Sequence, residues 1–218
     1  MRKTLLAASA LAAATLFSAP AFAQDSAPGG FRVGVIGGLD IVRPGDSEDS
    51  RVRGDDQSIE GALYGIEAGY DIPLGGAILG IEGEFSGSTA KVTTDSSDPN
   101  FFGYGRVKAG RDLYVGARLG FEAASGTLVY AKGGYTNARL DVTADNGTST
   151  RDENFQLDGW RLGAGVEKSI GTNTYAKLEY RYSNYTNADF QFANGAVTDT
   201  FDIDTDRHQI VAGVGFRF

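Results

Sequence analysis

Few residues of this chain have the type and spacing that catalysis requires. His208 is the only histidine, and imidazole is the side chain most often used as a general base near neutral pH. No serine lies two residues from it to act as a nucleophile, because Gln209 and Ile210 follow. Glu82 and Glu84 form a carboxylate pair such as glycosidases use. We expect them to pair with basic neighbours, since they lie two positions apart on one strand face.

The sequence signals for metal and cofactor sites are equally weak. Asp202, Asp204 and Asp206 alternate like calcium ligands, but the glycine and the bidentate glutamate of an EF-hand are missing. Weak binding of divalent cations by acidic loops stays an alternative. Gly163-x-Gly165 is too short for a dinucleotide fingerprint. The chain has no cysteine, which excludes disulfides and thiolate metal sites. The sequence therefore predicts no enzyme activity, no metal and no cofactor.

The residues that follow His208 have a period of two. Apolar side chains occupy one parity, while glycine and polar side chains occupy the other. The apolar set is Ile210, Ala212, Val214, Phe216 and Phe218, against Gln209, Gly213, Gly215 and Arg217. Apolar groups on one face with small or charged groups on the other are typical of a strand in an outer-membrane barrel. His208 falls on the apolar parity at the outer rim, so we expect packing or loop hydrogen bonding there.

The same alternation occurs in seven earlier segments. They cover approximately residues 31–42, 59–72, 77–90, a strand ending near 122, 127–142, 157–170 and 174–186. Short turns at 73–76, 123–126 and 171–173 alternate with long polar loops at 43–58, 91–104, 143–156 and 187–205. Short turns at one end and long loops at the other are the topology of outer-membrane barrels. We predict an all-β fold, an eight-stranded antiparallel up-and-down transmembrane β-barrel over residues 31–218.

The N-terminal residues resemble an export signal. A basic start, Met1-Arg2-Lys3, precedes an apolar stretch and the small-x-small sequence Ala21-Phe22-Ala23. We expect residues 1–23 to be a cleaved signal peptide and 24–30 a short polar leader. No other stretch is apolar for long enough to form a membrane helix. The net charge of −8 with no basic stripe argues against nucleic-acid binding.

Charges of both signs fall on the inner parity of the predicted strands. A barrel of eight strands has an interior just wide enough for side chains, so we expect these charges to form a paired network that fills it. A narrow ion path or gate is the alternative. The main candidates are Arg32, Glu67, Glu82, Glu84, Arg118, Lys132, Arg161, Glu167, Lys177, Glu179, Arg181 and Arg217, with Asp40, Asp71 and Glu122 on the same parity.

Aromatic residues cluster near the strand ends. Such positions predict two interfacial girdles at the membrane surfaces. Phe31, Tyr70, Phe121, Phe216 and Phe218 are assigned to the periplasmic edge, and Phe85, Tyr135, Trp160 and Tyr182 to the outer edge.

Three stretches resemble a known family: DGWRLGAGVE at 158–167, KLEYRY at 177–182 and the terminal GVGFRF at 213–218. They are similar to the small outer-membrane β-barrel proteins of Gram-negative bacteria, namely the OmpA-type transmembrane domain, the opacity proteins and the alphaproteobacterial porin-like surface antigens. The resemblance implies location in the outer membrane. The peptidoglycan-binding domain of full-length OmpA proteins is expected to be missing.

We therefore expect a monomer in the outer membrane with a structural or surface-interaction role carried by its four acidic loops. A narrow porin-like channel is the alternative, and a lipid-modifying enzyme is a second one. Expected partners are outer-membrane lipid and lipopolysaccharide, the assembly machinery through the C-terminal strand, and a surface ligand at loops 43–58 and 187–205.

Overall fold

The computed structural model describes residues 28–44, 59–94, 105–145, 150–191 and 201–218. The expected signal peptide and most of the polar leader lie outside these ranges. In the described part of the chain, no helix is long and apolar enough to cross a bilayer.

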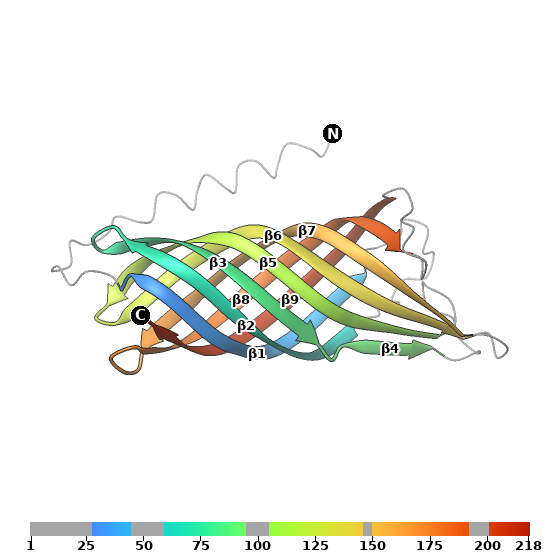
Figure 1. The fold of residues 1–218 in the computed structure, drawn as a ribbon, viewed down its shortest axis with the longest axis horizontal. Helices are drawn as coiled ribbons and strands as arrows, with labels where there is room; N and C mark the ends of the chain where they lie inside the picture. The colour runs from blue at the N-terminus through green and yellow to red at the C-terminus, as the bar shows by residue number, and fades with distance from the viewer. Residues whose placement is uncertain (1–27, 45–58, 95–104, 146–149, 192–200) are drawn as a thin grey trace, which may run out of the picture.

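The described residues form one closed sheet of tilted strands (Figure 1). The strands are β1 (Gly30–Pro44), β2 (Ile59–Pro73), β3 (Ala77–Ser88), β4 (Lys91–Thr94), β5 (Gly105–Ala124), β6 (Thr127–Asp145), β7 (Thr150–Ser169), β8 (Thr174–Gln191) and β9 (Phe201–Arg217).

Strands that follow each other in the chain pair antiparallel, except β3 and β4, and β9 pairs with β1 to close the cylinder. β3 and β4 both pair with β5, so they are two parts of one barrel strand separated by Thr89 and Ala90. The fold is therefore an eight-stranded antiparallel β-barrel, as the alternation predicted.

Exposure along the strands inverts the order of a soluble protein. On β3, Ile81 and Phe85 are 68% and 52% exposed, while Glu82 and Glu84 are 4% and 6% exposed. The period of two thus places apolar side chains outside and charged side chains inside.

Tight turns join the strands at one end of the cylinder. Gly75 and Gly126 adopt φ values of 75° and 63° in the β2–β3 and β5–β6 turns. Glycine reaches these left-handed angles without steric cost. Leu74 N donates to Ala77 O at 2.7 Å, which closes the first of these turns.

At the opposite end of the cylinder, three of the connections between strands are shorter than the sequence predicted. The expected loop at 91–104 begins with strand β4. The expected loop at 143–156 is wrong, because β6 continues to Asp145 and β7 begins at Thr150. The expected loop at 187–205 is likewise shortened by β8 and β9. These segments are rich in polar and charged residues, so the sequence lacks the long apolar alternation of the wall although backbone pairing continues.

Candidate functional site

Buried ion pairs fill the barrel interior and begin at the end with the tight turns. Arg217 donates to Asp71 at 2.8 Å and to Glu167 at 2.5 Å. Arg118 contacts the same two carboxylates, at 2.5 Å for Asp71 and 2.9 Å for Glu167. Arg32 lies 3.3 Å from Asp71 and so extends the network toward the middle. Two carboxylates therefore bridge three guanidinium groups from β1, β5 and β9.

Lysines link the middle of the barrel. Lys132 contacts Glu82 at 2.7 Å and Glu179 at 2.8 Å, and Arg32 donates to the same Glu82. Lys177 donates to Glu67. These groups come from five strands, β1, β2, β3, β6 and β8, and each of these ion pairs joins two strands that are not neighbours in the sheet. The pairs therefore cross-link the wall through the interior.

At its other end, the network includes Asp40 on β1. Arg181 contacts Glu84 at 2.7 Å, and Arg161 contacts Asp112 at 2.5 Å. Arg207 contacts Asp112 at 2.7 Å and donates to both oxygens of Asp40, each at 2.7 Å.

Two interior tyrosines support this network. Tyr114 lies beneath Lys132, with the ammonium 4.8 Å from the ring centroid. Tyr130 packs under Arg118 at 5.1 Å and donates its hydroxyl to Glu179 at 2.6 Å. Aromatic faces favour cations at such distances. The sequence did not predict that these tyrosines support the cations.

The structure brings all twelve main interior candidates into this network. It adds Asp40 and Asp71, which the parity placed inside, and two members that the candidate list missed, Asp112 and Arg207. Glu122 lies near the end of β5 and accepts a hydrogen bond from Gly126 N at 2.9 Å. The network contains equal numbers of cationic and anionic side chains. They are Arg32, Arg118, Lys132, Arg161, Lys177, Arg181, Arg207 and Arg217 against Asp40, Glu67, Asp71, Glu82, Glu84, Asp112, Glu167 and Glu179.

His208 lies outside this network, on the outer wall. Its Nδ1 is 2.7 Å from the hydroxyl of Tyr180, and its ring is 5.2 Å from that of Tyr182. Among the described residues no group of three His, Asp or Glu side chains could hold a metal ion. The side chains of Asp202 and Asp204 lie outside the described part, so the calcium alternative is not addressed there.

Residues 9–218 match the model of the outer membrane protein beta-barrel domain. The chain belongs to this family. Its strands therefore cross the outer membrane, with the tight turns on the periplasmic side.

Two curated relatives of this barrel are outer-membrane proteins. The 31 kDa outer-membrane immunogenic protein of Brucella melitensis is 29% identical, over 79% of this chain and 74% of the relative. The 22 kDa outer membrane protein of Rhizobium leguminosarum is 25% identical, over 84% of this chain and 76% of the relative.

Solved structures agree on the fold. Neisserial surface protein A has a TM-score of 0.51 at 17% identity, over 89% of this chain and 99% of that one. Outer membrane protein OprG from Pseudomonas aeruginosa has a TM-score of 0.53 at 13% identity, over 88% and 97%. At such low identity the likeness concerns the barrel architecture.

The aromatic candidates of this outer-membrane barrel point outward. Phe31 and Phe218 approach each other near the periplasmic end, with ring centroids 6.2 Å apart. Trp160 and Tyr182 are 5.4 Å apart toward the outer end. Exposed fractions range from 42% to 73% for all of the named candidates except Tyr182, which is half-buried between Trp160 and His208. The exposed candidates are Phe31, Tyr70, Phe85, Phe121, Tyr135, Trp160, Phe216 and Phe218.

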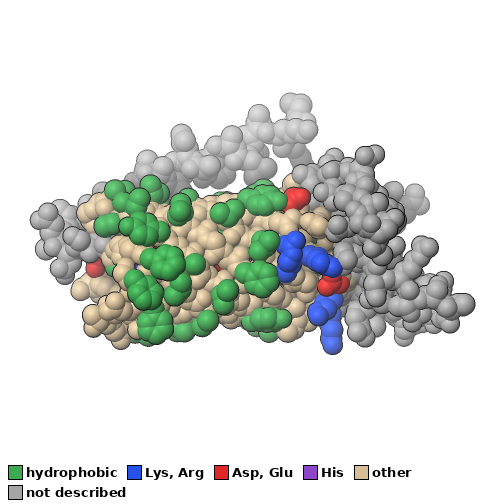
Figure 2. Space-filling model, in the orientation of Figure 1, with side chains coloured by type: hydrophobic (Ala, Val, Ile, Leu, Met, Phe, Trp, Pro, Cys, Tyr) green, Lys and Arg blue, Asp and Glu red, His purple; other side chains and the backbone are tan. Residues whose placement is uncertain are grey.

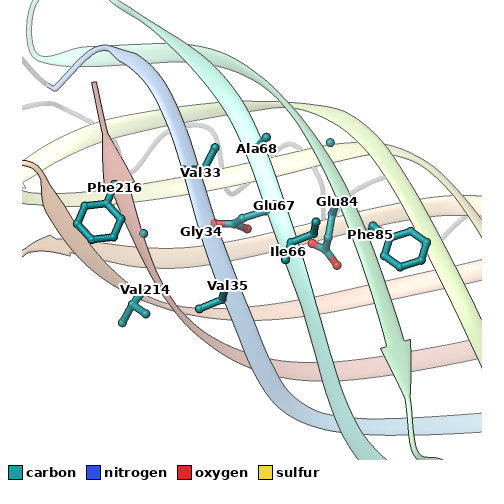
Figure 3. A pocket seen from close by; sticks show the side chains of 12 residues that line it. Val33, Gly34, Val35, Ile66, Glu67, Ala68, Glu84, Phe85, Val214 and Phe216 are labelled. Atoms are coloured by element: carbon teal, nitrogen blue, oxygen red, sulfur yellow. The ribbon is translucent and has the colours of Figure 1, made fainter.

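The wall of the outer-membrane barrel is hollowed over β9, β1, β2 and β3. The hollow has a volume of about 620 Å³, and Figure 3 shows Val33, Phe85 and Phe216 among the side chains at its edge. A second hollow of about 730 Å³ shares Val35, Ile66 and Phe85 with the first and continues toward β5. The two form one apolar track along the lipid-facing wall, which we call the wall groove.

Proposed function

We propose that this protein is a closed structural barrel whose outer end carries a surface-interaction role, without enzyme activity. The observation that carries this proposal is the charge-balanced interior network. Eighteen of the nineteen ion pairs in the described part of the chain belong to it. A network of this kind holds the strands together and needs no bound counterion, because its cations and anions are equal in number.

Burial argues against the channel alternative. Arg32, Asp71, Arg161 and Arg181 are 0% exposed, so no continuous column of solvent passes beside them. Opening a path would break several buried ion pairs. Removing one partner of a buried pair costs about 3–5 kcal/mol, so an open state would be rarely populated.

Conductance of the refolded barrel in a planar lipid bilayer tests this proposal. Only preparations whose unboiled band shifts on heating in a denaturing gel are used. Wild-type protein should give no stable current steps. Arg181→Ala removes the side chain that contacts Glu84 and Glu179, and it serves as a positive control for an opened interior. Regular steps from the wild type that disappear on charge reversal at Arg118 would contradict a closed barrel.

The surface role is assigned to the outer end because its sequence is acidic and polar there, in residues 43–58 and 187–205. The Brucella melitensis relative is named an immunogenic protein, which supports exposure of this end on the cell. Replacing residues 45–58 by a glycine–serine linker of equal length provides a test. Antisera raised against intact cells should lose recognition of the variant while its heat-shifted band is kept. Unchanged recognition would remove this segment from the proposal.

The lipid-enzyme alternative depends on His208. Its Nδ1 already contacts Tyr180 on the outer wall, and a base there needs a nucleophile within hydrogen-bond reach. We propose that this histidine packs at the membrane boundary. Lipid-processing activity that is lost in His208→Gln but kept in Tyr182→Phe would overturn that assignment.

A further inference from the structure

Basic side chains gather on one sector of the outer wall. Figure 2 shows Lys and Arg side chains at the end of the barrel where β4 lies, beyond the scattered apolar side chains of the wall. Lys91 on β4, Lys108 and Arg111 on β5 and Arg139 on β6 are exposed or half-buried. We call these four residues the basic sector.

The basic sector begins where the apolar band of the wall ends. On β5 the outward side chains change from Val115 and Leu113 to Arg111 and Lys108. A register shift between Ala109 and Asp112 allows this, because it places both Arg111 and Lys108 on the outer face. In an outer-membrane barrel this level corresponds to the headgroups of the outer leaflet.

The charges within this sector are not balanced by its own acids. Lys91 and Lys108 are directly opposite each other in the β4–β5 pairing, and like charges in this position are destabilising. Asp141 lies opposite Lys108 on β6 but is paired with Arg139 at 2.9 Å. Glu60 is an exposed acid on the neighbouring β2. Cations therefore outnumber acids, and a bound anion would remove the repulsion between the two lysines.

Arg111 is held in place by a neighbouring strand. Its Nη1 donates to Asn137 Oδ1 on β6 at 3.0 Å. The remaining guanidinium donors can contact an anion at the wall. A planar guanidinium with a fixed orientation is suited to phosphate, because two parallel N–H groups match two phosphate oxygens.

The wall groove starts at the same place. Its upper part is lined by Tyr64, Ile66 and Phe85 and ends at Lys108 and Arg111. An apolar track that ends at two cations has the charge and shape of an anionic amphiphile. The phosphate would lie at the cations, and an acyl chain would lie in the groove.

We propose that the basic sector and the wall groove form a binding site for a phosphorylated, acylated lipid of the outer leaflet, namely the lipid A part of lipopolysaccharide. Lys108 and Arg111 bind its phosphate, Lys91 adds charge, and Ile66 and Phe85 contact one acyl chain. This site goes beyond the proposed surface role, because it requires only that the folded barrel lie in the outer membrane.

Native mass spectrometry of the folded barrel in detergent tests the site. Three probes are titrated: diphosphorylated lipid A, its dephosphorylated form and phosphatidylglycerol. The wild type should bind one diphosphorylated lipid A at least about tenfold more tightly than either other probe, since charge-assisted bonds to phosphate are the stronger ones. Equal binding of the dephosphorylated form, preference for phosphatidylglycerol, or no binding would overturn the proposal.

Paired variants distinguish binding of the lipid phosphate from binding of the acyl chain. Lys108→Ala with Arg111→Ala should weaken lipid A binding about tenfold or more. Lys168→Ala removes an exposed lysine at the periplasmic turns, where Nζ donates to Ser125 O at 2.9 Å, and should change nothing. Gly83→Leu introduces a side chain into the wall groove. A Cβ at position 83 would lie 3.8 Å from the nearest atom, so the substitution does not clash with the backbone. Gly37→Leu lies outside the groove with a nearest atom at 3.7 Å.

Gly83→Leu should weaken binding, and Gly37→Leu should not. Every variant must show the heat-shifted band of a folded barrel. Should the double variant fail to fold, Lys108→Gln alone is used, with an expected loss of about threefold or more. Folded variants at positions 108 and 111 that bind lipid A like the wild type would overturn the site.

Discussion

Arg207 on β9 donates two hydrogen bonds of 2.7 Å each to the carboxylate of Asp40 on β1. β1 and β9 are the first and last strands, so this pair lies across the seam that closes the barrel. Gln209 adds a third bond to Asp40 at 3.2 Å. Residues distant in sequence thus join the barrel wall both through backbone pairing and through a buried charge pair.

Removing Asp40 should destabilise the barrel strongly. In Asp40→Ala the buried Arg207 keeps Asp112 as its anion and loses its bidentate partner. We expect the free energy of unfolding to fall by about 3–5 kcal/mol, the usual cost of breaking a buried pair. Urea unfolding followed by the heat-shifted band measures this loss. Asp141→Ala is the control: its pair with Arg139 is about 40% exposed on both sides, and such pairs contribute about 0–1 kcal/mol. Similar losses in the two variants would refute the role of the seam pair.

The interior network should resist salt. Its members are almost fully buried, and dissolved ions screen exposed charges much more than buried ones. We expect the urea midpoint to change little between low salt and about 1 M salt, where the Debye length is about 3 Å. A steep fall with salt would mean that water and ions enter the interior. Potassium chloride and sodium sulfate should be compared, because sulfate also strengthens apolar burial.

Gly134→Ala should impair folding. A Cβ at this position would lie 2.2 Å from Val115 O and 2.4 Å from Gly116 Cα. These are backbone atoms of the paired strand β5, so the clash cannot be relieved by rotating a side chain. We expect a loss of about 1–3 kcal/mol or more, the range for overpacked positions. Gly83→Ala is the matched control, since its Cβ would have 3.8 Å of room. Equal refolding yields of the two variants would contradict the steric argument.

Phe218→Ala separates assembly from stability. The Phe218 side chain is 73% exposed, and its ring lies 6.2 Å from that of Phe31. We propose that the assembly machinery recognises this terminal aromatic. The variant should then refold in detergent like the wild type and yield less folded barrel in cells. Phe121→Ala removes another exposed aromatic, 47% exposed, away from the C-terminus. Equal cellular yields for both variants would argue against recognition of Phe218.

The alternation of side chains predicted the barrel wall because each strand in the membrane has only two kinds of surroundings. Ile81 and Phe85 had to face lipid if Glu82 and Glu84 were inside, and the exposures follow this order. The short turns could also be predicted from the sequence, since Gly75 and Gly126 occur where φ must be positive. The identity of the ion partners was not readable, because parity places Glu82 inside but does not decide whether Lys132 or Arg181 lies within reach.

Two kinds of position escaped the pattern for physical reasons. A β-bulge adds a residue to one strand, so parity changes within it. This is why the outward positions of both Lys108 and Arg111 could not be read from the period of two. Arg207 was missed because it precedes the clear alternation that begins at Ile210. The segments that meet at Asp145 and Thr150 are polar in sequence, so their pairing has no apolar signature.

The four strands β5 to β8 remain paired far above the apolar band. β5 begins at Gly105 opposite Ala144, and β7 pairs with β8 as far as Asn154 and Gln191. From Tyr135 to Asp145, ten residues at about 3.4 Å each and a tilt of about 40° raise the rim by about 25 Å. β1 and β2 end closer to the membrane. Among the described residues, β5 to β8 therefore project farther from the membrane than β1 and β2. The projecting edge is built from hydrogen-bonded backbone, so it can present side chains to the medium at fixed positions.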